Sequence, residues 1–189
     1  MKKILLSVLL LLCAVVALQA QKLKGNFSGL AGQENINVVF VYDGVTYDGD
    51  SEAAFFKDNS DRDDFAEWKS NWAGSFRTDW ATAFVAECNQ ELAKKSLKVG
   101  DFPTADYTAT VKLTDIDPGS FAGPFSQPCK LTGVITFAKT GDNTSFATIE
   151  FKKLPGNSYQ MTPLVEQRVK FAFNQLGEAL GKILDKKVK

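Results

Sequence analysis

The chain has 189 residues, of which 44% are hydrophobic and 23% are charged, a composition typical of a globular protein with a sizeable core. Lys and Arg together number 22, as do Asp and Glu, so the sequence lacks the basic excess of a nucleic-acid-binding surface, and we expect no nucleic-acid partner. The sequence contains no His, which excludes imidazole metal ligands and His-based acid–base pairs.

The N-terminus has the pattern of a secretory signal peptide. Lys2 and Lys3 precede an apolar run over residues 4–17 that only Ser7 interrupts, and the small residue Ala20 follows. This run is shorter than the hydrocarbon core of a bilayer requires. We therefore expect cleavage after Ala20 and a periplasmic or secreted product with no integral membrane span. An uncleaved membrane anchor is the alternative.

The cysteine pattern leaves two interpretations open. Cys13 lies in the predicted signal peptide, so Cys88 and Cys129 remain as a pair in a compartment that permits disulfides. A bridge between them would stabilise the fold by about 3 to 4 kcal/mol. The alternative is two buried free thiols that pack as small apolar side chains.

The predicted mature chain divides into three parts. Residues 21–34 contain three Gly and little apolar periodicity, which predicts a flexible leader that is either a tether or an edge segment. Residues 35–186 contain the strand and helix patterns of a single α+β domain. Residues 187–189 are predicted to form a basic tail, which suits the C-terminal end of a helix.

The first half of the domain is predicted to form a strand and a long helix. Residues 36–42 are almost all β-branched or aromatic, as in a central strand. Residues 61–95 carry a large apolar side chain every three or four positions, which predicts one long amphipathic helix. Gly74 lies inside this segment and indicates close packing or a break.

The second half is predicted to form three strands and a second helix. Residues 107–114 alternate between apolar and polar side chains, and residues 129–138 and 145–153 are predicted to pair as an antiparallel hairpin. Pro163 opens a helix with an apolar stripe. This order predicts an α+β fold: a mostly antiparallel sheet of about four strands, with two long helices packed on one face.

Two segments carry a resemblance to a known group of proteins. The strand entry Ala105-Asp106-Tyr107 and the closing helix, with Leu176-Gly177 and Leu180-Gly181, resemble bacterial envelope domains related to the amino-terminal domain of the translocation protein TolB. Penicillin-binding-protein activator lipoproteins belong to the same group. The resemblance implies a binding or assembly module without enzymatic activity.

Acidic residues cluster at three places: Asp48 and Asp50, Asp61 to Asp64, and Asp115 and Asp117. Each cluster lies at a predicted turn or helix start, where Asp caps the backbone. Glycoside hydrolysis by paired carboxylates and calcium binding are the alternatives. We expect no catalytic residue, no metal site and no cofactor.

Aromatic side chains are the binding candidates. Phe121 and Phe125 lie in a loop rich in Pro and Gly, and Trp68, Trp72 and Trp80 lie on the first helix, where core packing is the alternative. We predict an exported, non-enzymatic envelope protein that binds an envelope protein, a glycan or a lipid. The alternative function is a carrier of a small apolar ligand, a lipid or glycan fragment, in a cleft between helix and sheet.

Overall fold

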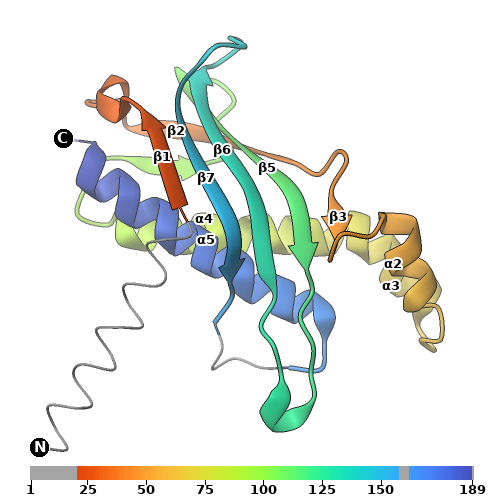
Figure 1. The fold of residues 1–189 in the computed structure, drawn as a ribbon. Coiled ribbons are helices and arrows are strands. Elements are labelled where there is room, and N and C mark those ends of the chain that lie inside the picture. Colours follow the sequence, from red (N-terminus) through yellow and green to blue (C-terminus); the bar gives the residue numbers. More distant parts are fainter. Residues whose placement is uncertain (1–20, 158–161, 189) are drawn as a thin grey trace, which may run out of the picture.

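The computed structural model describes residues 21–157 and 162–188, so the predicted signal peptide lies outside the described residues (Figure 1). The strands are β1 (Gln21–Gly25), β2 (Asn35–Val41), β3 (Thr46–Tyr47), β4 (Lys98–Gly100), β5 (Tyr107–Asp117), β6 (Lys130–Lys139) and β7 (Ser145–Pro155). The helices are α2 (Glu52–Asp58), α3 (Phe65–Ala73), α4 (Ser75–Glu91) and α5 (Val165–Lys187), with short 3-10 turns η1 (Phe27–Leu30) and η2 (Gly123–Phe125).

The α+β fold has a seven-stranded mixed sheet, so the predicted sheet of about four mostly antiparallel strands is wrong. The strand order is β1-β7-β6-β5-β2-β4, with β3 beside β5. β1, β7, β6 and β5 pair antiparallel, whereas β2 is parallel to both β5 and β4, and β3 is parallel to β5. The parallel pairing of β2 with β5 is possible because the helical segments lie between them in the chain.

The described residues contain four α-helices where two were predicted. The predicted helix over residues 61–95 is two helices, because Gly74 adopts φ −111° and ψ −102°, outside the helical range, between α3 and α4. The prediction also missed α2. This helix begins after Ser51, whose hydroxyl accepts a hydrogen bond from the backbone N–H of Ala54 at 3.2 Å.

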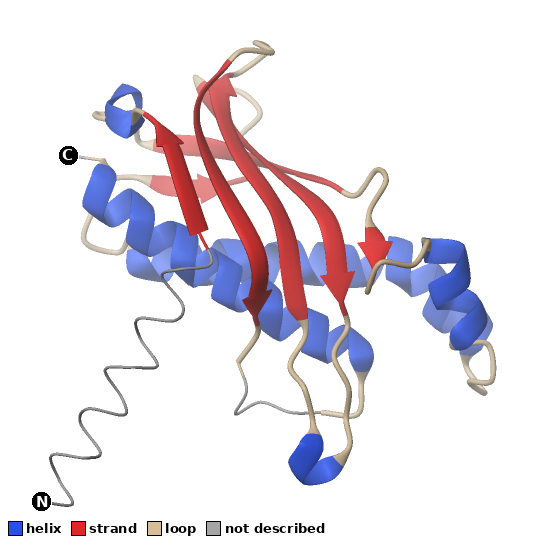
Figure 2. Cartoon of the chain, viewed as in Figure 1, coloured by secondary structure: helices blue, strands red, loops and turns tan. Residues whose placement is uncertain are grey.

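The two longest helices, α4 and α5, form a layer across one face of the sheet (Figures 1 and 2). They approach closely at two glycines. A Cβ atom on Gly177 would lie 2.2 Å from the carbonyl oxygen of Phe84, and one on Gly181 would lie 2.7 Å from that of Cys88. Phe84 in turn meets Phe40 of β2 with a ring-centroid separation of 5.2 Å. The core therefore lies between this helix layer and one face of the sheet.

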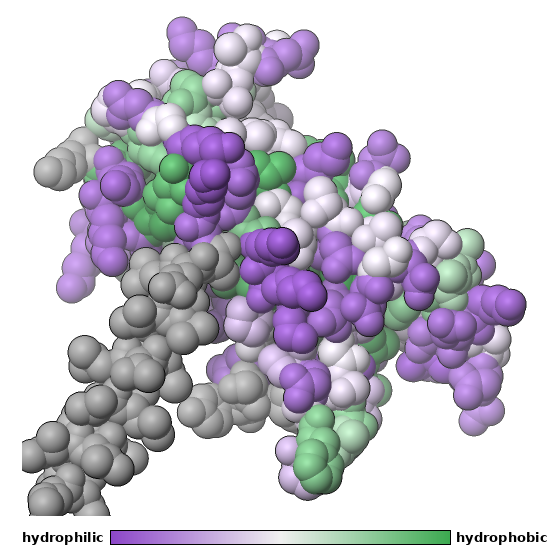
Figure 3. Space-filling view, viewed as in Figure 1, coloured by the Kyte–Doolittle hydropathy of each residue, from purple (hydrophilic) through white to green (hydrophobic). Residues whose placement is uncertain are grey.

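The other face of the sheet, the open face, is not covered by any helix of the described residues (Figure 2). Along β5, Val111 and Leu113 point to the core and are fully buried, whereas Thr110 is half-buried and Lys112 is exposed. Figure 3 looks onto the open face and shows hydrophilic side chains over the strands. This face shows the period-two alternation of a sheet with one solvated side.

Both ends of the described chain belong to the folded domain. Residues 21–34, the predicted leader, form an edge segment and not a flexible tether: they contain β1, which pairs with β7 at the sheet edge, and η1, whose Phe27 and Leu30 are buried. At the other end, α5 continues to Lys187 and Val188 is buried. Of the predicted basic tail, only Lys189 lies outside the described residues.

Candidate functional site

An apolar projection extends from the sheet in the connection between β5 and β6. We call residues 120–127 the hairpin tip. Phe125 is 80% exposed and Phe121 is 48% exposed, the two largest values among the exposed large hydrophobic side chains of the described residues. Figure 3 shows the tip as a hydrophobic knob at the lower end of the molecule. The structure therefore brings Phe121 and Phe125 together on one solvent-facing loop.

Hydrogen bonds within the tip fix its shape. Ser120 and Gln127 exchange backbone N–H···O=C bonds of 3.0 and 2.9 Å. The hydroxyl of Ser126 donates to the carbonyl oxygen of Gly123 at 2.7 Å and accepts from the backbone N–H of Ala122 at 3.0 Å. The tip thus presents its two rings from a backbone that is already ordered, which lowers the entropy cost of binding.

Arg168 of α5 joins the base of the tip to the start of the helix. Its guanidinium donates from Nε to the carbonyl oxygen of Pro118 at 3.0 Å and from Nη1 to those of Thr162 and Pro163 at 2.9 Å each. Arg168 is buried, and this burial lowers its pKa, although an arginine remains charged at neutral pH. One buried cation therefore connects the β5–β6 hairpin to the segment before α5.

Asp117 fixes the turn where the chain leaves β5. Its carboxylate accepts a hydrogen bond from the backbone N–H of Gly119 at 2.9 Å and pairs with Lys130 at 3.0 Å. Gly119 has φ +66°, and a Cβ atom there would lie 2.3 Å from the carbonyl oxygen of Gln127. Only glycine fits this position without strain. Asp117 therefore has a local structural role.

The chemistry of the tip suits apolar contact. The sequence from Pro118 to Cys129 contains no charged residue. Its polar side chains are Ser120, Ser126 and Gln127, which flank the exposed rings. An apolar centre with a polar rim is typical of a protein-binding surface.

The three tryptophans pack in the core, the alternative that the sequence left open, and do not form an exposed platform. Trp68, Trp72 and Trp80 are all buried, and Trp72 and Trp80 meet at a ring-centroid separation of 5.0 Å. Each indole N–H finds an acceptor inside the fold. Trp72 donates to the hydroxyl of Tyr47 at 2.9 Å, and Trp80 donates to the carbonyl oxygen of Glu166 at 3.0 Å.

The third indole N–H, that of Trp68, donates to a carboxylate oxygen of Glu166 at 3.2 Å. The hydrogen bonds of Trp68 and Trp80 to Glu166 connect α3 and α4 to the first turn of α5. The tryptophans therefore serve the packing of the helices and leave no indole available to a partner.

Cys88 and Cys129 are free, buried thiols, so the structure does not contain the disulfide that the sequence left open. Cys88 lies against Gly181, whereas Cys129 lies near Arg168, about 20 Å away along α5. A bridge requires Cα atoms within about 7 Å. Burial raises the pKa of Cys88 to about 12 and raises that of Cys129 as well, so neither thiol is poised as a nucleophile.

Members of two of the three acidic clusters make local side-chain contacts. Asp115 accepts from the hydroxyl of Thr46 at 2.6 Å and from the backbone N–H of Gly49 at 3.0 Å, and Asp64 pairs with Arg62 at 3.0 Å. Within residues 21–157 and 162–188, no group of three or more Cys, Asp or Glu side chains is arranged to hold a metal ion. None of the helices in this part of the chain is long and apolar enough to cross a membrane.

Aromatic rings of the helices and the sheet pack together in the layer where the apolar-ligand cleft was predicted. Phe173 of α5 lies 5.6 Å from the ring of Trp80 and 5.8 Å from that of Phe40, measured between centroids. These three rings and Phe84 bring α4, α5 and β2 into direct contact. The residues that would line such a cleft are therefore part of the core.

The structural role of Arg168 was not predicted from the sequence, although its position in the apolar stripe of α5 indicates such a role. Arg168 lies three residues after Val165 and next to Val169, on the apolar stripe of α5. A cation at a stripe position is buried only if it finds acceptors. Its partners here are backbone carbonyl groups, which no side-chain pattern encodes.

No protein-family model and no curated protein sequence matches the chain. Among solved structures, the chain is similar to the PelC dodecamer from Paraburkholderia phytofirmans, with a TM-score of 0.43 and 7% sequence identity over 85% of this chain and 97% of that chain. A point variant of the same protein gives a TM-score of 0.38 and 9% identity over 85% and 95% of the two chains.

Proposed function

We propose that this protein is an exported, non-enzymatic module of the bacterial envelope that binds a protein partner through its hairpin tip. The observation that carries the proposal is the 80% exposure of Phe125 on an ordered projection with no charged residue. Full burial of a Phe side chain is favourable by roughly 1.5 to 3 kcal/mol. The two exposed rings contribute little of this to folding, so a partner that buries them would gain it as binding free energy. An exposed apolar patch on a fixed loop favours recognition.

The partner expected at this tip offers an apolar pocket with polar groups at its edge. Phe125 is the side chain that would enter the pocket, and Phe121 would pack beside it. Leu164, which is also exposed, precedes α5 close to Pro163, a residue bound to Arg168, and would extend the apolar contact. This arrangement matches the aromatic anchor and polar rim of protein interfaces.

Export is a second part of the proposal and has its own test. The sequence pattern of residues 1–20 and the resemblance to TolB-related envelope domains support it. If the signal peptide is cleaved after Ala20, intact-mass measurement of the protein secreted by its source organism gives a chain that begins at Gln21. A mature chain that retains residues 1–20 would contradict this part alone.

The test of partner binding compares two purified variants with the native protein. The Phe121→Ser/Phe125→Ser double variant removes both rings, and Leu23→Ser, an exposed apolar residue on β1, is the matched control. Each protein, immobilised, is presented with an envelope extract of the source organism. We expect the double variant to lose a partner that the native protein and the control both retain.

Both variants should remain folded, because the replaced side chains are 38% to 80% exposed and the loss of each costs at most about 2 kcal/mol. Unchanged recovery of the partner by the folded double variant would exclude the hairpin tip as its binding site.

A further inference from the structure

The open face of the sheet carries polar side chains in two neighbouring rows that cross the strands. The first row consists of Val39, Thr110, Thr136, Thr148 and Lys24. The second row consists of Val41, Lys112, Val134, Glu150 and Lys22. Hydroxyl groups and cations therefore lie side by side on a surface without an aromatic ring in either row.

The charge on this face is predominantly positive. Glu150 is the acidic member of the two rows, and it forms an ion pair with Lys24. Lys24 holds the pKa of Glu150 below its ordinary value, and Lys22 adds to the effect. Lys112 and Lys152 make no ion pair within the described part of the chain. Asp115 and Asp117 are further carboxylates on this face, and Asp117 pairs with Lys130. The face therefore still has more lysines than carboxylates.

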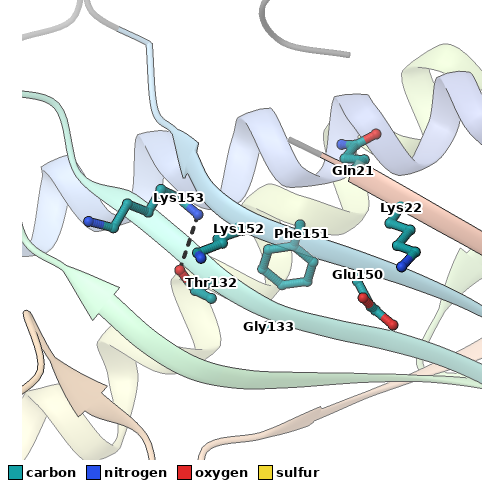
Figure 4. A pocket seen from close by; sticks show the side chains of 8 residues that line it. All are labelled: Gln21, Lys22, Thr132, Gly133, Glu150, Phe151, Lys152 and Lys153. Carbon is teal, nitrogen blue, oxygen red and sulfur yellow. Dashed lines mark hydrogen bonds between the residues drawn. The ribbon is translucent and has the colours of Figure 1, made fainter. Parts of the chain in front are cut away.

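A shallow hollow of about 620 Å³ lies on this side of β6 and β7, beside β1 (Figure 4). Its lining residues are Gln21, Lys22, Thr132, Gly133, Glu150, Phe151, Lys152 and Lys153. Three of them are lysines, so the hollow lies within the positively charged part of the face.

A bulge in β7 brings two of these lysines together. Lys152 and Lys153 both stand opposite Thr132 of β6, because the register shifts there. Lys153 adopts φ 50°, a conformation that costs energy for a residue with a side chain, and its backbone N–H donates to the hydroxyl of Thr132 at 3.1 Å. Figure 4 shows this bond beside the hollow.

The spacing of the cations indicates the size of their ligand. Lys22 and Lys112 lie in one row three strands apart, or about 14 Å, and Lys152 lies about 7 Å along β7 from that row. A single phosphate requires donors that converge on one point. Cations spread over such distances instead match an extended chain with repeated negative charges.

We propose that the open face binds an acidic polysaccharide through Lys22, Lys112, Lys152 and Lys153. Carboxylates along the polymer would lie over the lysines, and its hydroxyl groups would meet the threonines of the first row. Nucleic-acid bases, by comparison, stack on aromatic rings, which these rows lack. This surface is separate from the hairpin tip, so the proposal does not depend on the proposed protein partner.

The test measures binding of oligomannuronate by isothermal titration calorimetry. Lys112→Gln/Lys152→Gln removes two cations from the open face. The matched control, Lys94→Gln/Lys186→Gln, removes two exposed lysines that lie outside the sheet. We expect the first variant to bind about tenfold more weakly and the control to remain within about twofold of the native protein.

Other ligands and added salt show whether the binding is electrostatic and specific for an acidic polysaccharide. Binding should weaken as salt is added and should be absent for neutral dextran, and poly-glutamate and a single-stranded oligonucleotide should bind more weakly than oligomannuronate. The Phe121→Ser/Phe125→Ser variant should bind oligomannuronate like the native protein, which separates this site from the tip. Absence of oligomannuronate binding, equal weakening by both lysine variants, or equally tight binding of poly-glutamate would overturn the proposal.

Discussion

Arg168 links the hairpin tip to α5 through one buried guanidinium, and its replacement measures what that link contributes. The Arg168→Met variant keeps an apolar stem but leaves the carbonyl groups of Pro118, Thr162 and Pro163 without this donor. We expect the free energy of unfolding to fall by about 2 to 3 kcal/mol in urea denaturation. Limited proteolysis should cut the tip faster than in the native protein.

The control for this prediction is Arg62→Met. Arg62 pairs with the exposed Asp64 and lies 4.7 Å from the ring centroid of Trp68, so its loss should lower the free energy of unfolding by about 1 kcal/mol, less than the loss of Arg168. Equal stabilities of the two variants would show that the buried guanidinium does not hold the tip.

The two buried thiols predict how the free energy of unfolding depends on pH. In the unfolded chain a thiol ionises near pH 9, whereas burial raises the pKa of Cys88 in the folded state to about 12. Between these values the unfolded state loses its proton first, so the contribution of this thiol to the free energy of unfolding is constant below about pH 8 and falls as the pH rises toward 12. Burial raises the pKa of Cys129 as well and adds to this fall.

Urea denaturation near pH 7 and near pH 10 measures this dependence. The Cys88→Ala/Cys129→Ala variant should lose less stability between the two pH values than the native protein. In the native protein both thiols should react with a thiol reagent only after unfolding. Rapid reaction in the folded state, or an intact disulfide in the secreted protein, would contradict the account.

The packing of α4 against α5 depends on the glycines of α5. Ala in place of Gly177 improves helix propensity by about 1 kcal/mol but places a Cβ atom 2.2 Å from the carbonyl oxygen of Phe84. Overpacking costs up to about 3 kcal/mol, and the neighbour here is backbone that cannot rotate away, so Gly177→Ala should destabilise by about 2 kcal/mol in urea denaturation. Lys186→Ala, on the exposed side of α5, is the control and should be nearly neutral. A Gly177→Ala variant as stable as the control would show that the helices are not in close contact.

Elements with a strong periodic pattern could be predicted from the sequence. The alternation over residues 107–114 predicts β5, and the apolar stripe of the last helix predicts the side of α5 that is buried. β3 and β4 are only two and three residues long, so no period is visible, and β1 contains Lys22 and Lys24 at the sheet edge. The order of the strands in the sheet could not be predicted either, because pairing between strands that are distant in the sequence leaves no local pattern.

At the scale of the whole molecule, the sequence identified the tip but could not separate surface rings from core rings. Phe121 and Phe125 stand in a loop with several Pro and Gly residues, a local sign of exposure. The tryptophans follow helical spacing, which does not reveal how many elements cover a helix. α3 and α4 meet the start of α5 and the ring of Phe55, so all three indoles are enclosed.

The arrangement of surfaces also distinguishes the two proposed binding sites. The hairpin tip lies beyond the end of the sheet (Figures 1 and 3), whereas Lys22, Lys112 and Lys152 lie on strands of the sheet. The two proposed sites therefore share no residue.

Site-specific photocrosslinking tests the role of the hairpin tip most directly. Benzoylphenylalanine replaces Phe125 in one sample and Val39, an exposed residue on the open face, in another. After irradiation in the source organism, the account predicts a covalent adduct between position 125 and the partner that the Phe121→Ser/Phe125→Ser variant fails to recover. An adduct to that partner from position 39 and none from position 125 would contradict it.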